Sequence, residues 1–147
     1  MNRLPCLFAL LALVVTGCGP SLHVPGGFAR VDGRHDLRIA SPEGVVVAVN
    51  VHRNRSPRGD LQFWAGALES RVHRLYGQVD RSPITTDEGM EGVQLRATTV
   101  RQGRPHHYWT AVFVTRRKVV VVEAGGDDAY FVPQRDHVEA AMRSVEI

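Results

Sequence analysis

Two apolar runs on either side of a basic corner decide the fold: YWTAVFV (residues 108–114), TRRK (115–118) and VVVV (119–122). Both runs are rich in aromatic and β-branched residues, which are enriched in strands. Neither run alternates between apolar and polar residues, so both faces of each strand are expected to be covered. The sequence therefore predicts two central strands, over His106–Thr115 and Lys118–Ala124, joined by a short basic turn.

Two more strands are predicted upstream of this hairpin, over Gln78–Thr85 and Gly92–Arg101. Turn-forming residues separate consecutive strands at Asp87-Glu88-Gly89 and at Gln102-Gly103. Connections this short make consecutive strands antiparallel neighbours. We therefore expect a four-stranded antiparallel meander.

An earlier hairpin is predicted between His35–Ala40 and Val45–Val51, because Ser41-Pro42-Glu43-Gly44 has the residues of a turn. The odd-numbered valines of the second strand line one face. Val46 and Ala48 make part of the other face apolar as well. Both faces of this strand are therefore expected to be covered.

A long helix is predicted over residues 61–76. Asp60 stands at the N-cap position and Gly77 closes the helix. The apolar positions share about a third of the helix circumference: Leu61, Trp64, Ala65, Leu68, Val72, Leu75 and Tyr76. Phe63 lies on the polar side and is a candidate partner-binding aromatic, with packing of the first turn against a neighbouring loop as the structural alternative.

A last helix is expected to begin at Pro133, because proline suits the first helical position. Its apolar residues recur at helical spacing: Val138, Ala141, Met142 and Val145. The element order is then hairpin, long helix, meander and helix. This order defines an α+β domain with a single, mostly antiparallel β-sheet flanked by helices, which is an α/β/α sandwich.

The first residues have the pattern of an export signal. Arg3 supplies the positive start, Leu4–Val15 is an unbroken apolar stretch, and Thr16 and Gly17 are the small residues needed near a cleavage site. The stretch is too short to span a membrane as a mature helix. We therefore expect export from the cytoplasm.

The segment Val15-Thr16-Gly17-Cys18 resembles the bacterial lipobox, which ends in an obligatory cysteine. The resemblance implies cleavage between Gly17 and Cys18 and a lipid on Cys18, which would hold the protein on a membrane. An ordinary secretory signal with Cys18 as a passenger thiol is the alternative. The expected organisation is a lipoprotein signal peptide over 1–17, a lipidated tether over 18–27 and one domain over 28–147.

Cysteine usage and charge limit the chemistry of the mature domain. Cys6 lies in the signal, so lipidation of Cys18 would leave no free thiol, no disulfide and no cysteine-ligated metal. The net charge is +3, and Lys118 is the sole lysine, so arginine supplies the other positive charges. Arginine forks suit phosphates and carboxylates. Arg116, Arg117 and Lys118 form the densest positive cluster, a candidate contact for an anionic head group or an acidic partner.

No residue pattern predicts a catalytic or metal site. The adjacent His106 and His107 would point to opposite faces of a strand, and no His-Glu-x-x-His, Gly-x-Ser-x-Gly or Walker motif is present. Asp127 and Asp128 follow a glycine pair, which favours a turn and a helix start over a calcium site or an acid–base pair. We therefore predict no catalytic residues, no metal, no cofactor and no nucleic-acid partner.

The domain resembles the PsbP-like superfamily, which includes DcrB-like envelope lipoproteins. The similarity rests on the element order, the tryptophan-bearing helix, the DEGMEG turn (87–92) and the VVVVEA stretch (119–124) before a closing helix. It covers residues 28–147 and implies a binding or assembly role without shared catalytic residues. We expect a membrane-anchored envelope lipoprotein that serves as a non-catalytic interaction or assembly module for an unidentified envelope protein.

Two expectations about location and chemistry complete the prediction. Gly19 is not the aspartate that retains some lipoproteins at the inner membrane, so the resemblance implies the periplasmic face of the outer membrane. The alternative function is a small-ligand-binding or metal-binding envelope protein, or a hydrolase. That function requires a pocket in which several polar groups converge: His35, His52, His73, Asp127 and Asp128.

Overall fold

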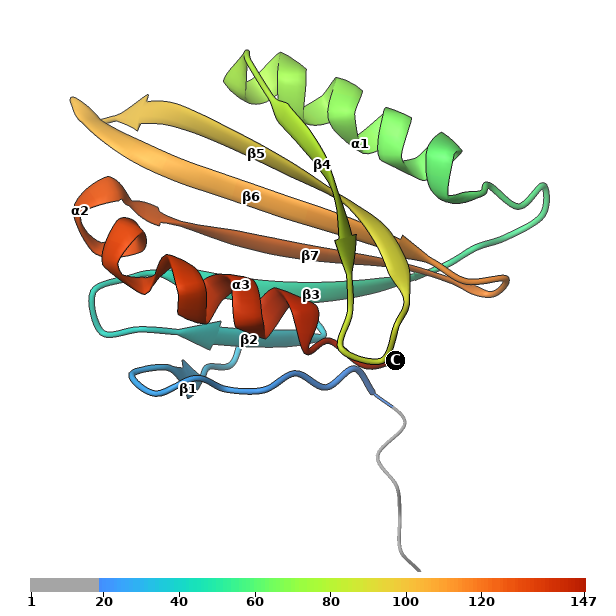
Figure 1. The fold of residues 1–147 in the computed structure, drawn as a ribbon, viewed down its shortest axis with the longest axis horizontal. Coiled ribbons are helices and arrows are strands. Elements are labelled where there is room, and N and C mark those ends of the chain that lie inside the picture. The colour runs from blue at the N-terminus through green and yellow to red at the C-terminus, as the bar shows by residue number, and fades with distance from the viewer. Residues whose placement is uncertain (1–18) are drawn as a thin grey trace, which may run out of the picture.

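The computed structural model describes residues 19–147; the predicted signal peptide and Cys18 lie outside the described residues. The elements in chain order are β1 (Ala29–Arg30), β2 (Leu37–Ala40), β3 (Val46–Arg53), α1 (Leu61–Tyr76), β4 (Asp80–Thr85), β5 (Glu91–Arg101), β6 (Arg104–Val114), β7 (Lys118–Asp127), α2 (Asp128–Phe131), the 3-10 helix η1 (Val132–Gln134) and α3 (Arg135–Arg143). The strands form one antiparallel seven-stranded sheet in the order β1-β2-β3-β7-β6-β5-β4 (Figure 1). The predicted meander and the earlier hairpin are confirmed.

The β6–β7 hairpin contributes to both layers of the core, as its double-sided apolar sequence predicts. Phe113 pairs with Val120 in register and both are fully buried on one face. Val112 and Val119 are buried on the other face. Strand β3 joins β7 along its full length, so the two predicted sheet segments become one sheet.

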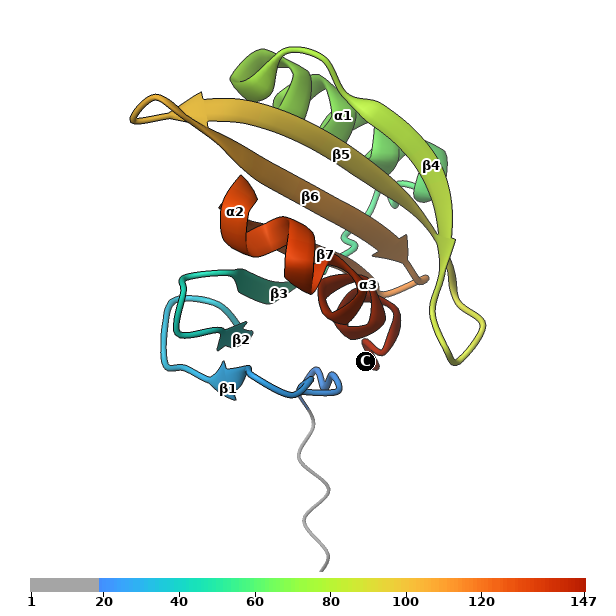
Figure 2. The ribbon, with the colours of Figure 1, turned by 60° about the vertical axis from the view of Figure 1, so that its left-hand side comes forward.

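Helices cover the two faces of the sheet (Figure 2). Helix α1 packs over β5 and β6, while α2, η1 and α3 lie on the opposite face, over the larger core cluster. This arrangement confirms the predicted α+β class. No helix within residues 19–147 is long and apolar enough to span a membrane.

Helix α1 confirms the predicted caps, but its apolar stripe is only partly covered. The Asp60 side chain accepts a 2.8 Å hydrogen bond from the Phe63 amide, and Gly77 ends the helix at φ 81°. Leu75, predicted as part of the buried stripe, is 61% exposed. It shares a flank of the helix with Trp64 and Leu68. Trp64 and Leu68 are themselves only half-buried, beside a hollow that they share with Val119 and Val121 of β7, so this flank is not fully packed and the prediction for Leu75 is wrong.

The Gly125-Gly126 pair lies inside β7 and does not form the turn that was expected there. A Cβ on Gly126 would lie 3.0 Å from Val45 Cγ2 and 3.3 Å from its Cα. Glycine is therefore needed for close packing against Val45. The strand consequently extends to Asp127, which caps α2 by accepting a hydrogen bond from the Ala129 amide.

The closing helical segment begins earlier than predicted. Pro133 lies in η1, after the short helix α2, and the regular helix α3 starts only at Arg135. Val138, Ala141 and Met142 are fully buried against the sheet, as their spacing predicts. The predicted start was wrong because the Asp127 cap, directly after a glycine pair, carries a weaker sequence signal than proline.

The predicted tether over 18–27 is not a free linker from Ser21 onward. Ser21 and Glu146 exchange backbone hydrogen bonds of 3.0 and 2.9 Å, and the His23 amide donates to Ser144 Oγ at 2.8 Å. Leu22 is buried in the larger core cluster. This segment therefore belongs to the domain. The sequence does not predict this, because the segment is held by pairing with residues near Glu146, which are distant in the chain.

Candidate functional site

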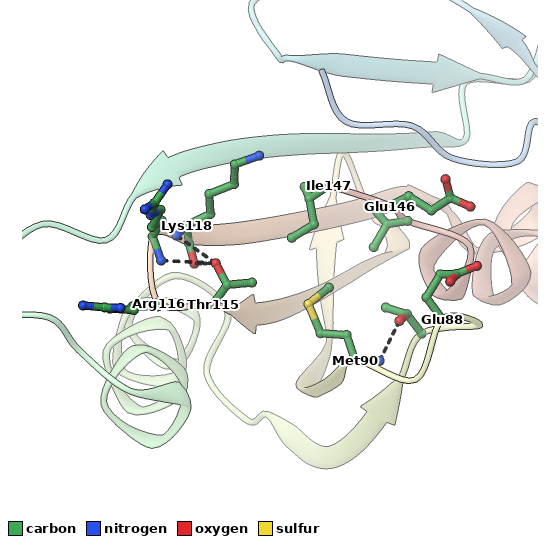
Figure 3. A pocket seen from close by; sticks show the side chains of 10 residues that line it. Glu88, Met90, Thr115, Arg116, Lys118, Glu146 and Ile147 are labelled. Carbon is green, nitrogen blue, oxygen red and sulfur yellow. Dashed lines mark hydrogen bonds between the residues drawn. The ribbon is translucent and has the colours of Figure 1, made fainter. Parts of the chain in front are cut away.

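A cavity of about 710 Å³ opens at the turn between β6 and β7 (Figure 3). Three segments that are distant in sequence line it: the β6–β7 turn, the β4–β5 turn and the last three residues described. The lining residues are Thr86, Glu88, Met90, Thr115, Arg116, Arg117, Lys118, Val145, Glu146 and Ile147. The three cations predicted as a binding cluster thus lie together on one wall.

Thr115 shapes the cationic wall. Its amide donates to the Lys118 carbonyl at 2.8 Å, and its Oγ1 accepts hydrogen bonds from the amides of Arg117 at 3.3 Å and Lys118 at 3.0 Å. The tight turn is therefore held by backbone and threonine groups. The side chains of Arg116, Arg117 and Lys118 do not take part in it and are available for binding.

The opposite wall comes from the β4–β5 turn. Thr86 forms this turn by donating its amide to the Met90 carbonyl at 2.9 Å and accepting from the Met90 amide at Oγ1, 3.0 Å away. Gly89 takes φ 86°, which favours glycine. Met90 and Ile147 extend into the space between the walls (Figure 3). The cavity therefore has an apolar centre.

The charges of the cavity are divided between its walls. Arg116 and Lys118 lie on one side, and Glu88 and Glu146 lie on the other (Figure 3). Arg117 also lines the cavity and belongs to the same turn as Arg116 and Lys118. Within residues 19–147 none of the three cations forms an ion pair. Such a site suits a ligand with an apolar part and separate polar groups of both signs, as a polypeptide segment has.

The β3–α1 loop adds a second set of cations beside the β6–β7 turn. Arg53 pairs in register with Lys118, and the Asn54 amide donates to the Arg117 carbonyl at 2.9 Å. The buried Asn54 side chain donates to the carbonyls of Thr115 at 3.1 Å and Gly59 at 2.9 Å. The six cations held together in this way are called the basic end: Arg53, Arg55, Arg58, Arg116, Arg117 and Lys118.

Phe63 lies next to the basic end but does not line the cavity. Its side chain is 62% exposed and meets the Trp64 ring edge-on, with centroids 5.3 Å apart. A Cβ on Gly59 would lie 2.4 Å from the Phe63 ring, so this ring rests on the β3–α1 loop. Phe63 therefore packs on a neighbouring loop, as the structural alternative expects, while its binding of a partner stays a prediction.

The histidines and acids of the alternative prediction do not form a shared pocket. His107 Nε2 lies 2.7 Å from Asp128 Oδ1, and its ring stacks on Phe131. His106 is on the other face of β6, where burial and then the charge of Arg101 lower its pKa. Within residues 19–147 no group of three or more His, Cys, Asp or Glu side chains is close enough to hold a metal ion.

A polar network on the α1 face of the sheet was not predicted. Tyr108 donates to Glu123 Oε1 at 2.5 Å, Asn50 Nδ2 donates to Glu123 Oε2 at 3.4 Å, and His35 Nδ1 contacts Asn50 Oδ1 at 3.0 Å. Burial, and then the bond to Glu123, raise the pKa of Tyr108. The alternation of strand residues places Tyr108 on this face, but the sequence does not show that β3 pairs with β7 and so brings Asn50 to Glu123.

The cations of the β3–α1 loop were also missed as part of a site. Arg53, Arg55 and Arg58 are visible in the sequence as a basic stretch, but nothing local connects them to residues 116–118. The connection is made by the non-local pairing of β3 with β7. The predicted lipidation and cleavage residues, Cys18 and Gly17, lie outside the described residues.

The seven-stranded antiparallel sheet between α1 and the α2–α3 segment is a PsbP-like fold. The solved structure of LpqN, involved in cell envelope biogenesis of Mycobacterium tuberculosis, is similar at a TM-score of 0.66 and 16% identity, covering 86% of this chain and 81% of LpqN. Cyanobacterial PsbP from Synechocystis is similar at a TM-score of 0.62 and 13% identity, covering 88% and 86%. At these identities the similarity is one of fold.

A third solved structure has the same arrangement. PA94 of Pseudomonas aeruginosa, described as a protein of unknown function and putative regulator, matches at a TM-score of 0.52 and 13% identity, covering 84% of this chain and 82% of PA94. No protein-family model matches the chain, and no curated protein matches its sequence. The similarity to known proteins is therefore found by comparing structures and not by comparing sequences.

Proposed function

We propose that this protein is a membrane-anchored lipoprotein of the bacterial cell envelope, in which the PsbP-like domain is a non-catalytic protein-interaction or assembly module. The observation that carries the proposal is the cavity at the β6–β7 turn, with an apolar centre and opposite charges on its two walls. A cavity of this kind binds a polypeptide segment through apolar contacts and charge pairing at once.

Anchorage is proposed at Cys18, after cleavage behind Gly17. The lipobox resemblance supports it, and the fold shared with LpqN, a protein involved in cell envelope biogenesis, supports an envelope location. Gly19 in place of aspartate favours the periplasmic face of the outer membrane. The partner is then an envelope protein that presents its binding segment close to the membrane.

Photo-crosslinking in cells tests this function. A photoreactive amino acid replaces Met90 in the cavity, and a matched control replaces Val100, which is 70% exposed on β5 near the β5–β6 turn. We expect a reproducible adduct with one envelope protein from position 90, absent from position 100 and lost when Cys18→Ala removes the anchor. No adduct from position 90, or the same adducts from both positions, would contradict a partner in this cavity.

A further inference from the structure

The basic end concentrates positive charge that the fold does not neutralise. Within residues 19–147 its six cations form no ion pair, and five of them are exposed while Lys118 is half-buried. Asp60 lies nearby, but its carboxylate is engaged as the N-cap of α1. Like charges held close together repel one another, so a surface of this kind favours an anionic partner.

The cations are presented on a rigid base. Asn54 is 5% exposed and ties the β3–α1 loop to the β6–β7 turn through the carbonyl of Thr115. Arg58 and Arg116 line one shallow hollow between these segments. The backbone that presents the cations is therefore preorganised and loses little conformational entropy on binding.

The chain enters the domain beside the cavity that the basic end borders. Ser21 pairs with Glu146, and Glu146 lines the cavity together with Arg116 and Lys118. Cys18 precedes Ser21 by three residues, which span roughly 10 Å when fully extended. An anchor on Cys18 would therefore hold this side of the domain close to the bilayer.

We propose that the basic end is a second membrane contact, which binds the head groups of anionic phospholipids and fixes the orientation of the domain. This inference rests on the proposed anchor at Cys18 for its geometry. Guanidinium groups bind phosphate oxygens in pairs, and four to eight clustered cations are enough to recognise an anionic membrane. The exposed Phe63 ring lies at the same end, where an aromatic side chain enters the interface between water and lipid.

This orientation places the mouth of the cavity at the membrane surface. Arg116 and Lys118 line the same cavity as Met90 and Ile147, so a bilayer that binds these two cations would also lie next to Met90 and Ile147. A partner segment that enters the cavity must accordingly come from a membrane-proximal region.

The test uses the mature lipidated protein reconstituted into vesicles. With Cys18 lipidated and Cys6 removed with the signal, Phe63→Cys provides a single thiol for an environment-sensitive fluorophore. We expect a blue-shifted emission on vesicles containing phosphatidylglycerol relative to pure phosphatidylcholine, and reversal of this shift at high salt. The same fluorophore on Val100→Cys, near the β5–β6 turn, should give equal emission on both vesicles.

Charge-reversal variants test the role of the cations. Arg55→Glu/Arg58→Glu should remove most of the shift, because each cation contributes roughly fivefold to binding at an anionic surface. The matched control Arg101→Glu/Arg135→Glu removes two exposed arginines outside the basic end and should leave the shift unchanged. Circular dichroism checks that both variants are folded.

Equal emission from position 63 on both vesicle types would overturn the proposal, as would an equal loss of the shift in both double variants. Mass spectrometry reports the lipid on Cys18 separately, so a missing anchor is distinguished from a missing contact. If position 63 shows no shift while position 90 still forms its crosslink in cells, the basic end binds an acidic protein and not the membrane.

Discussion

The two ends of the β6–β7 hairpin differ in whether their charged side chains form ion pairs. At the end formed by α2 and the β5–β6 turn, called here the far end, Arg104 lies 3.3 Å from Asp127 and His107 lies 2.7 Å from Asp128. At the basic end, six cations gather without an ion pair among the described residues. Charges that are paired within the fold stabilise it, whereas a cluster of unpaired like charges costs stability, which supports the proposed role of the basic end in binding.

The aromatic residues of the two ends differ in the same way. Phe131 at the far end is fully buried between His107 and Trp109, with ring centroids 4.9 and 5.0 Å away. Phe63 at the basic end is 62% exposed. The far end is therefore expected to govern stability, and the basic end is expected to govern interactions.

The largest expected effect comes from Phe131→Ala. Removal of a fully buried ring leaves a cavity and should lower the free energy of unfolding by about 3–5 kcal/mol. The matched variant Phe63→Ala should change it by about 0.5 kcal/mol or less, because that ring is mostly in solvent. Equilibrium denaturation in urea measures both values, and similar losses would contradict the assignment of different roles to the two ends.

Tyr108→Phe is expected to have the next largest effect. It removes the hydroxyl that donates to Glu123 and should cost about 1–3 kcal/mol, because a half-buried carboxylate loses a donor. The pKa of Tyr108 is raised in the folded protein, so the stabilisation is complete below the unfolded tyrosine pKa of about 10 and falls as the pH rises above it.

Denaturation of the Tyr108→Phe variant and of the unmodified protein across alkaline pH checks that the contribution of Tyr108 to stability falls as the pH rises. The difference in unfolding free energy between the two should shrink above pH of about 10. A difference that grows with pH would show that the phenol does not hold its proton in the folded state.

Asp128→Asn should have a smaller effect, of at most about 1 kcal/mol, because its carboxylate is 47% exposed and partly screened. The lost interaction is the contact with His107, which aligns α2 with the end of β6. Asp32→Asn, at an exposed position in the β1–β2 loop, is the control and should be neutral. Thermal unfolding of the two variants compares them, and equal melting temperatures would show that this far-end pair is not structural.

The smallest effect on stability is expected from Arg116→Glu/Arg117→Glu. It should change the free energy of unfolding by about 0.5 kcal/mol or less, with any gain greatest at low salt, where repulsion between the cations is unscreened. The crosslink from position 90 should nevertheless be lost. Arg104→Glu, which opposes Asp127 at the far end, is the control and should destabilise the protein more than the double variant does.

Most of the secondary structure could be predicted because its causes are local. Asp60 and Gly77 mark the ends of α1, and the turn residues between strands mark the meander. The errors have tertiary causes. Leu75 is exposed because its flank of α1 is not fully packed against the sheet, and Gly126 lies inside a strand where Val45 packs against it.

The candidate site could be predicted only in part. The residues 116–118 were identified from their charge density, and Phe63 from its place outside the apolar stripe. The apolar lining by Met90, Val145 and Ile147 has no sequence signal, because Met90 comes from the β4–β5 turn and the other two come from the C-terminal segment, which lie far apart in the chain.

The sequence by itself determined the longer strands, helix α1 with its caps, and the antiparallel order of the meander, because periodicity, capping and short turns act over a few residues. The tertiary structure alone decided that β3 lies beside β7 and that Ser21 pairs with Glu146. These pairings join segments far apart in the chain and depend on which buried faces fit together. The pairing of β3 with β7 brings the three cations of the β3–α1 loop next to the three of the β6–β7 turn. The pairing of Ser21 with Glu146 places the start of the domain beside them.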